Sequence, residues 1–328
     1  MILAGDIGAT KTRLAVFDGS AGRTDPIAER TYASHDYPGL EVIASEFVRA
    51  TGASISRACF GVAGPVKHGR SSTTNLAWIV DSRDLARDLR LPSVALLNDL
   101  EASAHGLPWL RPDEIIVLQE GAPDAAGHAA LIAAGTGLGE AGLYWDGRSH
   151  LPFATEGGHA SFAPSDENQI DLLRHLLRRF EQVSWERVLS GPGLVNIYSF
   201  LRDTGRGEEP PWLADEISAG EPAAVISTAA LSGRSRLCSD ALDLFVTLYG
   251  AEAGNFALKV MATGGVYVGG GIAPKILPRL RGPAFIGAFV AKGRMRPLLE
   301  AMPVRVVLND RLALLGSARY AVSEAATG

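Results

Sequence analysis

The chain begins with a short apolar run, a polar loop and a second apolar run. Residues 2–4 are Ile-Leu-Ala, residues 5–12 are Gly-Asp-Ile-Gly-Ala-Thr-Lys-Thr, and the turn signal Asp18-Gly19 follows the second run. Thr, Val and Phe in this second run favour a strand. The pattern therefore predicts a strand, a glycine-containing loop and another strand. Alternate side chains of the second strand fall on opposite faces, with Arg13, Ala15 and Phe17 on one face and Leu14 and Val16 on the other.

The loop at 5–12 nearly matches the phosphate-binding pattern G-x-x-x-x-G-K-[ST]. Gly5, Lys11 and Thr12 fit this pattern, but Thr10 replaces the second glycine. A P-loop also leads directly into a helix, whereas this loop leads into a strand. A hairpin can still bind phosphate through its backbone N–H groups, and Asp6 would suit a place beside Mg²⁺ or its bound water. A plain hairpin with a polar turn is the alternative that this segment leaves open.

The same template recurs in the middle of the chain. The apolar run 130–134 leads into Gly-Thr-Gly-Leu-Gly (135–139), a second strand pattern follows, and Asp146-Gly147 closes it. This recurrence predicts an internal repeat of architecture. Gly137, Gly139 and Gly142 also match the dinucleotide fingerprint G-x-G-x-x-G. We reject that match because a strand pattern, not a helix, follows it.

A third glycine cluster follows a short strand predicted at Val266–Val268. Gly269, Gly270 and Gly271 would let a flat base or ribose rest against bare backbone. The same residues also read as an ordinary strand-to-helix turn, with Pro274 starting the helix. Two hairpin loops and this cluster together follow the plan by which actin, Hsp70 and hexokinases hold a nucleotide.

Polar residues with catalytic potential follow a predicted buried strand at Val94–Leu97. Asn98 and Asp99 come directly after it and before a helix. Sites in α/β proteins lie at the carboxyl ends of such strands. Asp99 is equally suited to cap the helix, and this segment alone does not decide between the two roles.

Two further segments combine glycines with polar side chains. Glu156 and His159 flank two glycines in Phe-Ala-Thr-Glu-Gly-Gly-His, and the spacing suits hydrogen bonds to hydroxyl groups of a small ligand. A metal site is the alternative, but no third ligand lies nearby in the sequence. Glu186, shortly after Ser184, precedes a Gly-Pro-Gly break and alone would read as a helix-start residue.

Composition narrows the class of protein. The chain has 328 residues, of which 47% are hydrophobic and 20% charged, and its net charge is −5. These values predict a globular protein of two domains and argue against a partner among nucleic acids. Cys59 and Cys238 are too few for a disulfide framework or an all-cysteine zinc site. The N-terminus has no signal-peptide pattern and no apolar run is long enough to span a membrane, so we expect a cytoplasmic protein without a membrane partner.

With these motifs in view, the chain resembles the bacterial glucokinase family, in the branch that lacks a zinc motif. The segments GDIGAT, LLND, AAGTGLG, EGGH, ERVLSGPGLVNIY and VGGGI occur in the order and spacing of that family, and the match covers nearly the whole chain. The resemblance implies ATP-dependent phosphorylation of the 6-hydroxyl of glucose, giving glucose 6-phosphate and ADP. It also implies an α/β, two-domain actin-like ATPase (ribonuclease H-like) fold with a cleft between the domains, and a homodimer.

Roles carry over from the family motif by motif. Asp99 looks like the general base that takes the 6-hydroxyl proton. ATP is the implied cofactor. The Mg²⁺ ion that ATP carries would lie near Asp6, and the resemblance implies no resident metal. The sugar contacts would be Asn98, Glu156, His159 and Glu186. The nucleotide contacts would be Gly5, Asp6, Gly8, Ala9 and Thr10 in the first phosphate loop, Gly135, Thr136 and Gly137 in the second, and Gly270 and Gly271 at the nucleoside.

The sequence departs from the family pattern at two places. Ala9-Thr10-Lys11 stands where relatives often have Gly-Thr-Asn, which leaves the role of Lys11 open. Glu140 follows the second loop where an apolar residue is usual. The cysteine cluster of the related zinc-containing sugar kinases is absent.

The resemblance also divides the chain and leaves rival functions. A small α/β domain would comprise residues 1–109 and 305–328, and a large α+β domain residues 110–304. Residues 310–325 are predicted to form the returning helix, and 202–212 an exposed loop. The rivals are a kinase for another hexose, such as mannose or fructose, a sugar-responsive repressor and a non-catalytic sugar sensor. The repressor reading lacks an N-terminal DNA-binding segment, and the sensor reading conflicts with the presence of Asp99 and both phosphate loops.

Overall fold

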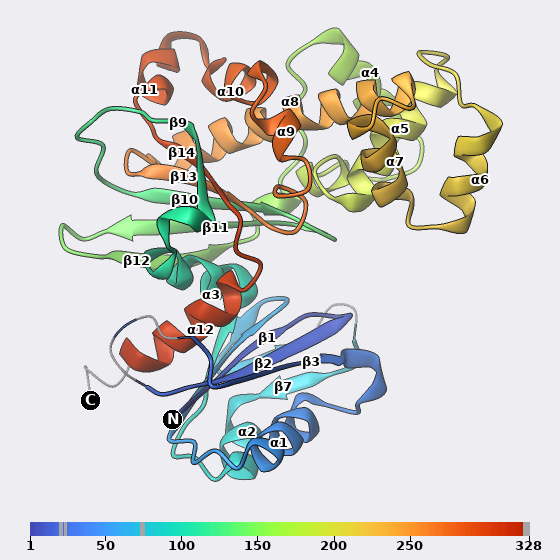
Figure 1. Ribbon diagram of the computed structural model, residues 1–328. Coiled ribbons are helices and arrows are strands. Elements are labelled where there is room, and N and C mark those ends of the chain that lie inside the picture. Colours follow the sequence, from blue (N-terminus) through green and yellow to red (C-terminus); the bar gives the residue numbers. More distant parts are fainter. Residues whose placement is uncertain (20–21, 23–24, 73–75, 324–328) are drawn as a thin grey trace. The chain divides into compact units, whose positions relative to one another are not determined.

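The computed structural model describes residues 1–19, 22, 25–72 and 76–323 (Figure 1). These residues form two compact units. The first unit contains residues 1–112, 151–154 and 309–328, and the second contains 113–150 and 155–308. The sequence-based division, at 109/110 and 304/305, stays a prediction, and it did not place residues 151–154 with the first unit.

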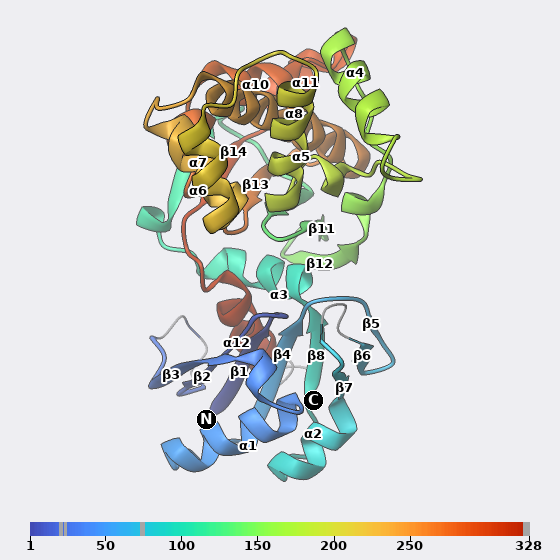
Figure 2. The ribbon, with the colours of Figure 1, turned by 90° about the vertical axis from the view of Figure 1, so that its right-hand side faces the viewer.

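The first unit is built on a five-stranded sheet of order β3-β2-β1-β4-β8. Strands β1, β2 and β3 are antiparallel neighbours, while β4 and β8 run parallel to β1. A small three-stranded sheet, β5-β6-β7, lies next to β8 (Figure 2). The strands are β1 (Ile2–Ile7), β2 (Lys11–Phe17), β3 (Ala28–Ala33), β4 (Arg57–Val62), β5 (Val66–Lys67), β6 (Arg70–Ser72), β7 (Ile79–Asp81) and β8 (Ala95–Asn98). The helices are α1 (Leu40–Thr51), α2 (Ser82–Leu89), α3 (Asp99–Gly106), α12 (Leu312–Ser323) and the 3₁₀ turns Ser34–Asp36 and Leu107–Trp109.

Helices cover both faces of this five-stranded sheet (Figure 1). Leu14 and Val16 pack into the apolar cluster under α1 and α2, whereas Ala15 and Phe17 pack into the cluster under α3 and α12. The alternation predicted for this strand is therefore confirmed. A sheet buried on both faces explains why the last four residues of β2, Leu-Ala-Val-Phe at 14–17, are all apolar.

Small residues let α3 and α12 approach closely. A Cβ atom added to Gly316 would overlap the carbonyl oxygen of Ala102, and one added to Gly106 would overlap the carbonyl oxygen of Leu312. A Cβ added to Gly61 of β4 would lie 2.7 Å from the Cβ of Ala102. These contacts fix α3 against the sheet and against α12, so the start of α3 has a defined place in the unit.

The second unit is built on a six-stranded sheet of order β12-β11-β10-β13-β14-β9. Its strands are β9 (Ile115–Gln119), β10 (Ala129–Ala134), β11 (Leu138–Trp145), β12 (His150–Thr155), β13 (Gly265–Gly269) and β14 (Val304–Val307). Its helices are α4 (Glu167–Leu176), α5 (Gly191–Asp203), α6 (Pro211–Ala219), α7 (Pro222–Leu231), α8 (Arg236–Val260), α9 (Leu277–Leu280), α10 (Pro283–Val290) and α11 (Arg296–Glu300). The 3₁₀ turns between these elements are Pro112–Glu114, Gly157–His159, Trp185–Arg187 and Gly293–Met295.

The long helix α8 is anchored to the sheet through Tyr249. The Tyr249 hydroxyl accepts a hydrogen bond from the N–H of Ala134 (3.1 Å) and contacts the carbonyl oxygens of Ile132 (3.4 Å) and Gly269 (3.2 Å). These backbone groups stand at the ends of β10 and β13. The anchor therefore holds both glycine loops that follow these strands to one buried helix.

The two sheets share one topology. Reading from the edge, β3-β2-β1-β4-β8 corresponds to β12-β11-β10-β13-β14. The hairpin pairs β2-β1 and β11-β10 are antiparallel, and two parallel pairs follow in each sheet. The internal repeat predicted from the two glycine hairpins is therefore confirmed. Both glycine loops connect strands, so neither a P-loop helix nor a dinucleotide-binding helix follows them.

Three boundaries differ from those predicted. The helix after Gly271 begins at Leu277 rather than Pro274, because Pro278 has no N–H to bond the carbonyl of residue 274 and is tolerated only in a first turn. The predicted loop 202–212 is shorter, since α5 ends at Asp203 and α6 begins at Pro211. The returning helix α12 spans 312–323, and Glu324 and Ala325 lie outside the described residues.

Candidate active site

The first glycine loop is a tight hairpin between β1 and β2. The N–H of Gly8 donates to the carbonyl oxygen of Lys11 (2.9 Å), so Ala9 and Thr10 form the tip of the turn. Lys11 and Thr10 are exposed, and Gly8 and Ala9 are half-buried. Gly5 lies within β1 instead, where an added Cβ would overlap the ring of Phe60. The structure thus gives Gly5 a packing reason that is separate from any ligand.

Ser34 ties this hairpin to the edge of the sheet. Its hydroxyl donates to the carbonyl oxygen of Gly8 (2.8 Å) and contacts the hydroxyl of Thr12 (3.0 Å), while its N–H donates to the carbonyl oxygen of Thr10 (3.1 Å). Ser34 is buried. Two contacts to the four-residue turn and a third to Thr12 beside it leave the hairpin little freedom, which suits a loop whose backbone must be held ready for an anion.

Asp6 sits beside a cluster of charged groups in the first unit. It pairs across β1 and β2 with Arg13, whose guanidinium group contacts Asp310 at 3.0 Å and Glu29 at 3.8 Å. Burial raises the pKa of Asp6, Arg13 lowers it, Asp310 raises it by a smaller amount, and the net pKa is about 6. A carboxyl group that loses its hydration in this way is stabilised in its charged form when a cation approaches.

Asn98 and Asp99 occupy the junction of β8 and α3. Asn98 is the N-cap of α3: its Oδ1 atom accepts from the N–H groups of Leu100 (2.9 Å) and Glu101 (3.3 Å), and its Nδ2 atom donates to the carbonyl oxygen of Gly64 (3.1 Å). Asp99 is the first helical residue and is half-buried, and its Oδ1 atom accepts from the N–H of Leu100 (3.0 Å). The cap that the sequence left open for Asp99 is therefore supplied by its neighbour.

The second and third glycine segments pack against each other in the second unit. The turn at Gly135–Gly137 is closed by a hydrogen bond from the N–H of Gly135 to the carbonyl oxygen of Gly137 (2.8 Å). Gly270 has a φ of +82°, and an added Cβ would overlap the carbonyl oxygen of Ala134, so glycine is required there. Nothing lies near an added Cβ at Gly271, which leaves its face open.

Glu156, His159 and Glu186 come from two adjoining 3₁₀ turns of the second unit. The segments that follow and precede these turns pair at Ser161 and Ser184, which brings the turns together. Glu156 and His159 are exposed and lie 3.8 Å apart, Oε2 to Nε2. Glu186 is half-buried, and its Oε2 atom accepts from the N–H of Leu138 (3.0 Å) at the end of the second glycine loop.

Several residues that lie beside the first glycine loop were not predicted from the sequence. Arg13, Ser34 and Asp310 approach the first loop only through strand pairing and chain return. One signal was available: the tripeptide Leu-Asn-Asp occurs at 97–99 and again at 308–310, after the fifth strand of each repeat. Reading that recurrence would have pointed to Asp310 as the counterpart of Asp99.

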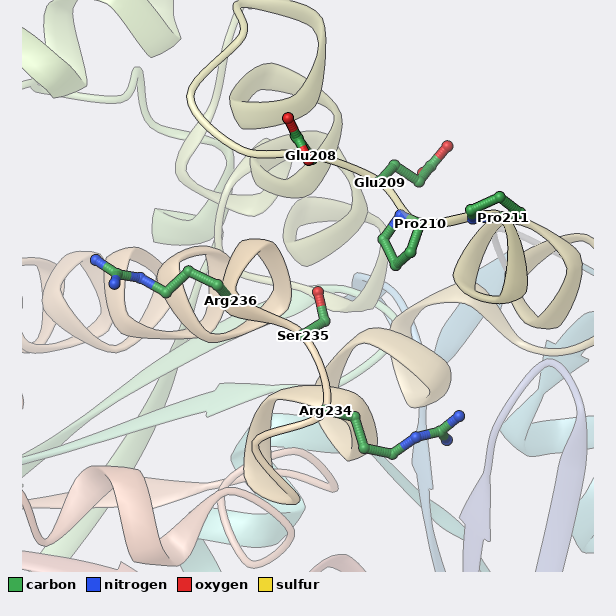
Figure 3. Close-up of a pocket in the computed structure, with 7 residues that line it drawn as sticks. All are labelled: Glu208, Glu209, Pro210, Pro211, Arg234, Ser235 and Arg236. Atoms are coloured by element: carbon green, nitrogen blue, oxygen red, sulfur yellow. The ribbon is translucent and has the colours of Figure 1, made fainter.

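A pocket of about 440 Å³ lies elsewhere in the second unit, between residues 208–211 and residues 234–236 (Figure 3). The side chains of Arg234 and Arg236 point away from each other in Figure 3 and pair with Glu216 (2.8 Å) and Asp240 (2.9 Å). These charges do not converge on a ligand, and no site residue predicted from the sequence lines the pocket. Within the described ranges, no three His, Cys, Asp or Glu side chains gather as a metal site would require, and no helix has the length and apolarity to cross a bilayer.

Two sheets of one topology, each with a glycine hairpin and an Asn-Asp pair at the end of its fifth strand, define a protein of the actin-like ATPase fold. The family model described as Glucokinase matches residues 3–324, and the chain belongs to this family.

Individual relatives agree with this assignment. A curated glucokinase from Nostoc punctiforme is 42% identical over 333 residues, which covers 97% of this chain and 98% of the relative. A crystal structure of glucokinase from an Antarctic psychrotroph is 30% identical, with a TM-score of 0.84 and 98% of each chain covered. A ROK family glucokinase from Streptomyces griseus, solved with glucose and AMPPNP, has a TM-score of 0.66 and 23% identity over 98% of this chain and 99% of that one. This last likeness concerns the fold.

Proposed function

We propose that the chain phosphorylates glucose at the 6-hydroxyl with ATP, giving glucose 6-phosphate and ADP. Membership of the glucokinase family across residues 3–324 is the observation that carries this proposal. The ordered glycine loops and the Asn98-Asp99 junction support it, because phosphoryl transfer needs positioning and charge neutralisation more than covalent help.

Asp99 is the proposed general base. Its carboxylate would accept the proton of the 6-hydroxyl as the oxygen attacks the γ-phosphorus of ATP. Asn98 caps α3 and so leaves Asp99 at the first helical position rather than in the capping role. A carboxylate within hydrogen-bond reach of the hydroxyl is sufficient for this step.

The proposed sugar contacts are Asn98, Glu156, His159 and Glu186. Exposed Glu156 and His159 have polar atoms available to a ligand, and Glu186 offers its remaining acceptor capacity beside the second loop. Fixed polar partners of this kind reject a sugar that lacks the matching hydroxyl, because the partner would then be left without its hydrogen bond.

The proposed nucleotide contacts are the three glycine segments. Gly8, Ala9 and Thr10 form the exposed first hairpin, and Gly135, Thr136 and Gly137 form the second. The open face at Gly271, next to the obligatory glycine at 270, suits the nucleoside, while Gly5 would act through its place in β1. Magnesium enters as part of the MgATP substrate, and half-buried Asp6 would gain from that cation or its water shell.

A coupled assay for hexose 6-phosphates tests the proposal. Purified protein with MgATP is offered glucose, mannose, fructose and N-acetylglucosamine in parallel. We expect turnover with glucose at the highest kcat/KM. A higher kcat/KM for mannose or fructose would support the proposed kinase mechanism but contradict glucose as the substrate. Glucose binding without product would contradict the catalytic assignment and favour a sugar sensor.

Two further features belong to this proposal on the strength of the family resemblance. We expect a homodimer, which sedimentation equilibrium of the purified chain would test. We also expect a cytoplasmic location, where ATP is available, and cell fractionation would test it.

A further inference from the structure

A buried carboxyl group lies directly behind the turn that carries Glu156 and His159. Glu140, on β11, is 1% exposed, and a Cβ added to Gly157 would overlap its Oε2 atom. The hydroxyl of Thr155 donates to the carbonyl oxygen of Glu140 (3.0 Å) and accepts from the N–H of Gly157 (3.2 Å). The turn at Gly157 is therefore held by both the main chain and the side chain of Glu140.

A second buried carboxyl group faces Glu140 from α8. Glu252 is 0% exposed, and its oxygens are held by the Nδ2 atom of Asn255 (2.8 Å) and the Nζ atom of Lys259 (3.4 Å). Glu252 raises the pKa of Glu140 through its charge and a side-chain hydrogen bond, and the Oε1 atom of Glu140 has no hydrogen-bond partner among the described residues. A carboxylate has no hydrogen to give, so two carboxyl groups can bond only when one of them is protonated.

We propose that Glu140 is a positioning residue for sugar binding, whose neutral carboxylic acid, bonded to Glu252, supports the Gly157 turn and so places Glu156 and His159. The placement explains the departure from the family pattern at this position. An apolar residue would fill the space behind the turn, whereas Glu140 fills it only while it holds a proton.

The surrounding charges agree with a proton on Glu140. Burial and the charge of Glu252 raise the pKa of Glu140, Lys259 lowers it, and the net pKa is about 8. Helix α8 also presents Tyr249, and Lys292, which follows α10, faces Glu252. Both lysines act on Glu252, whereas only Lys259 opposes the rise in the pKa of Glu140, and it does so more weakly than burial and Glu252. A second negative charge on Glu140 would repel Glu252 in a site closed to water, and the turn would have to move to let water in.

This inference rests on the proposed sugar site, because its first readout is glucose affinity. If glucose binds only the form with protonated Glu140, the KM for glucose should rise about tenfold between pH 7 and pH 9. The kcat at saturating glucose should change little from this cause, since bound sugar restores the proton.

The test compares Glu140→Gln, Glu140→Val and Glu300→Gln with the wild type. The amide of Glu140→Gln can donate to Glu252 as the acid does, so its KM should match the wild type at pH 7 and vary less than about twofold up to pH 9. Glu140→Val is uncharged at every pH and fills the space behind the turn with an apolar side chain, so its KM should stay constant from pH 7 to pH 9. Glu300, in a surface pair with Arg296, is the matched control for loss of one carboxylate and should keep the wild-type profile.

A second measurement needs no sugar. Hydrogen exchange of the amides in residues 155–160, corrected for intrinsic rates, should show protection that falls above pH 8 in the wild type and stays constant in Glu140→Gln. A wild type that does not bind glucose would overturn the proposed function, and the exchange result would still decide this inference. A rise in KM that persists in Glu140→Gln, or equal loss of protection in both proteins, would overturn the role of Glu140.

Discussion

At the scale of single residues, Asn98 takes the capping role and leaves Asp99 for the proposed catalytic role. Asn98 uses its side-chain oxygen for two N–H groups of α3 and its amide for Gly64, so the junction is held before any substrate arrives. Asp99, one residue later, carries its carboxyl group at the positive end of the same helix. A base placed in this way keeps its position when its charge changes during turnover.

Replacement of Asp99 by asparagine should separate catalysis from binding. Asn keeps the shape and can still accept from the N–H of Leu100, but it cannot take a proton, so kcat should fall about 10²–10⁴-fold. The KM for glucose should change little, and steady-state kinetics with MgATP measure both. Glu101→Gln removes a carboxylate from the same turn and is the control, with activity close to wild type. A nearly unchanged kcat in Asp99→Asn would exclude Asp99 as the base.

At the scale of elements, the sequence predicted what short segments decide. Both glycine hairpins, the strand before Asn98 and the helix at α12 follow from local alternation and turn residues. The contacts of Ser34 and Arg13 do not, because they depend on pairing between β2 and β3 and on the return of the chain at Asp310. Glu252 meets Glu140 only through the packing of α8 on the sheet. The roles of the site residues stay predictions.

The third glycine segment offers two substitutions that separate folding from binding. Gly270→Ala forces a side chain into a left-handed φ and against the backbone of Ala134, so it should destabilise the second unit by about 1–3 kcal/mol. Gly271→Ala meets open space and should keep the wild-type melting temperature while raising the KM for ATP. Thermal denaturation and ATP titration measure the two effects. An unchanged KM for ATP in Gly271→Ala would remove that residue from the nucleoside contact.

At the scale of the whole molecule, the two repeats share a topology but surround their carboxyl groups with different environments. In the first unit the hairpin strands carry Asp6 and Arg13, whose charges reach Asp310 and solvent. In the second unit the corresponding hairpin carries Glu140, which is closed off by α8 and by the Gly157 turn. The two repeats thus share a backbone topology, while the packing of the helices closes Glu140 off from solvent.

This contrast sets the pH dependence of stability. A carboxyl group with a raised pKa binds a proton more tightly when folded, so its contribution is full below its unfolded value and is lost as pH rises through the folded value. For Asp6 the window runs from about 3.8 to about 6, and for Glu140 from about 4.5 to about 8. Between pH 6 and pH 8 the free energy of unfolding should therefore fall, by up to about 1.4 kcal/mol per pH unit, through Glu140 and its partner Glu252.

Urea denaturation at pH 5, 6, 7 and 8 would measure this loss in the wild type and in Glu140→Gln. The amide that Glu140→Gln introduces does not titrate and can still donate to Glu252. The free energy of unfolding of the variant should therefore rise steadily relative to that of the wild type from pH 6 to pH 8. The loss of stability that Asp6 causes occurs below pH 6 and should be the same in both proteins. Parallel curves above pH 6 would mean that Glu140 is already ionised in the folded chain, and that the two buried carboxylates are tolerated by Lys259 and Lys292 alone.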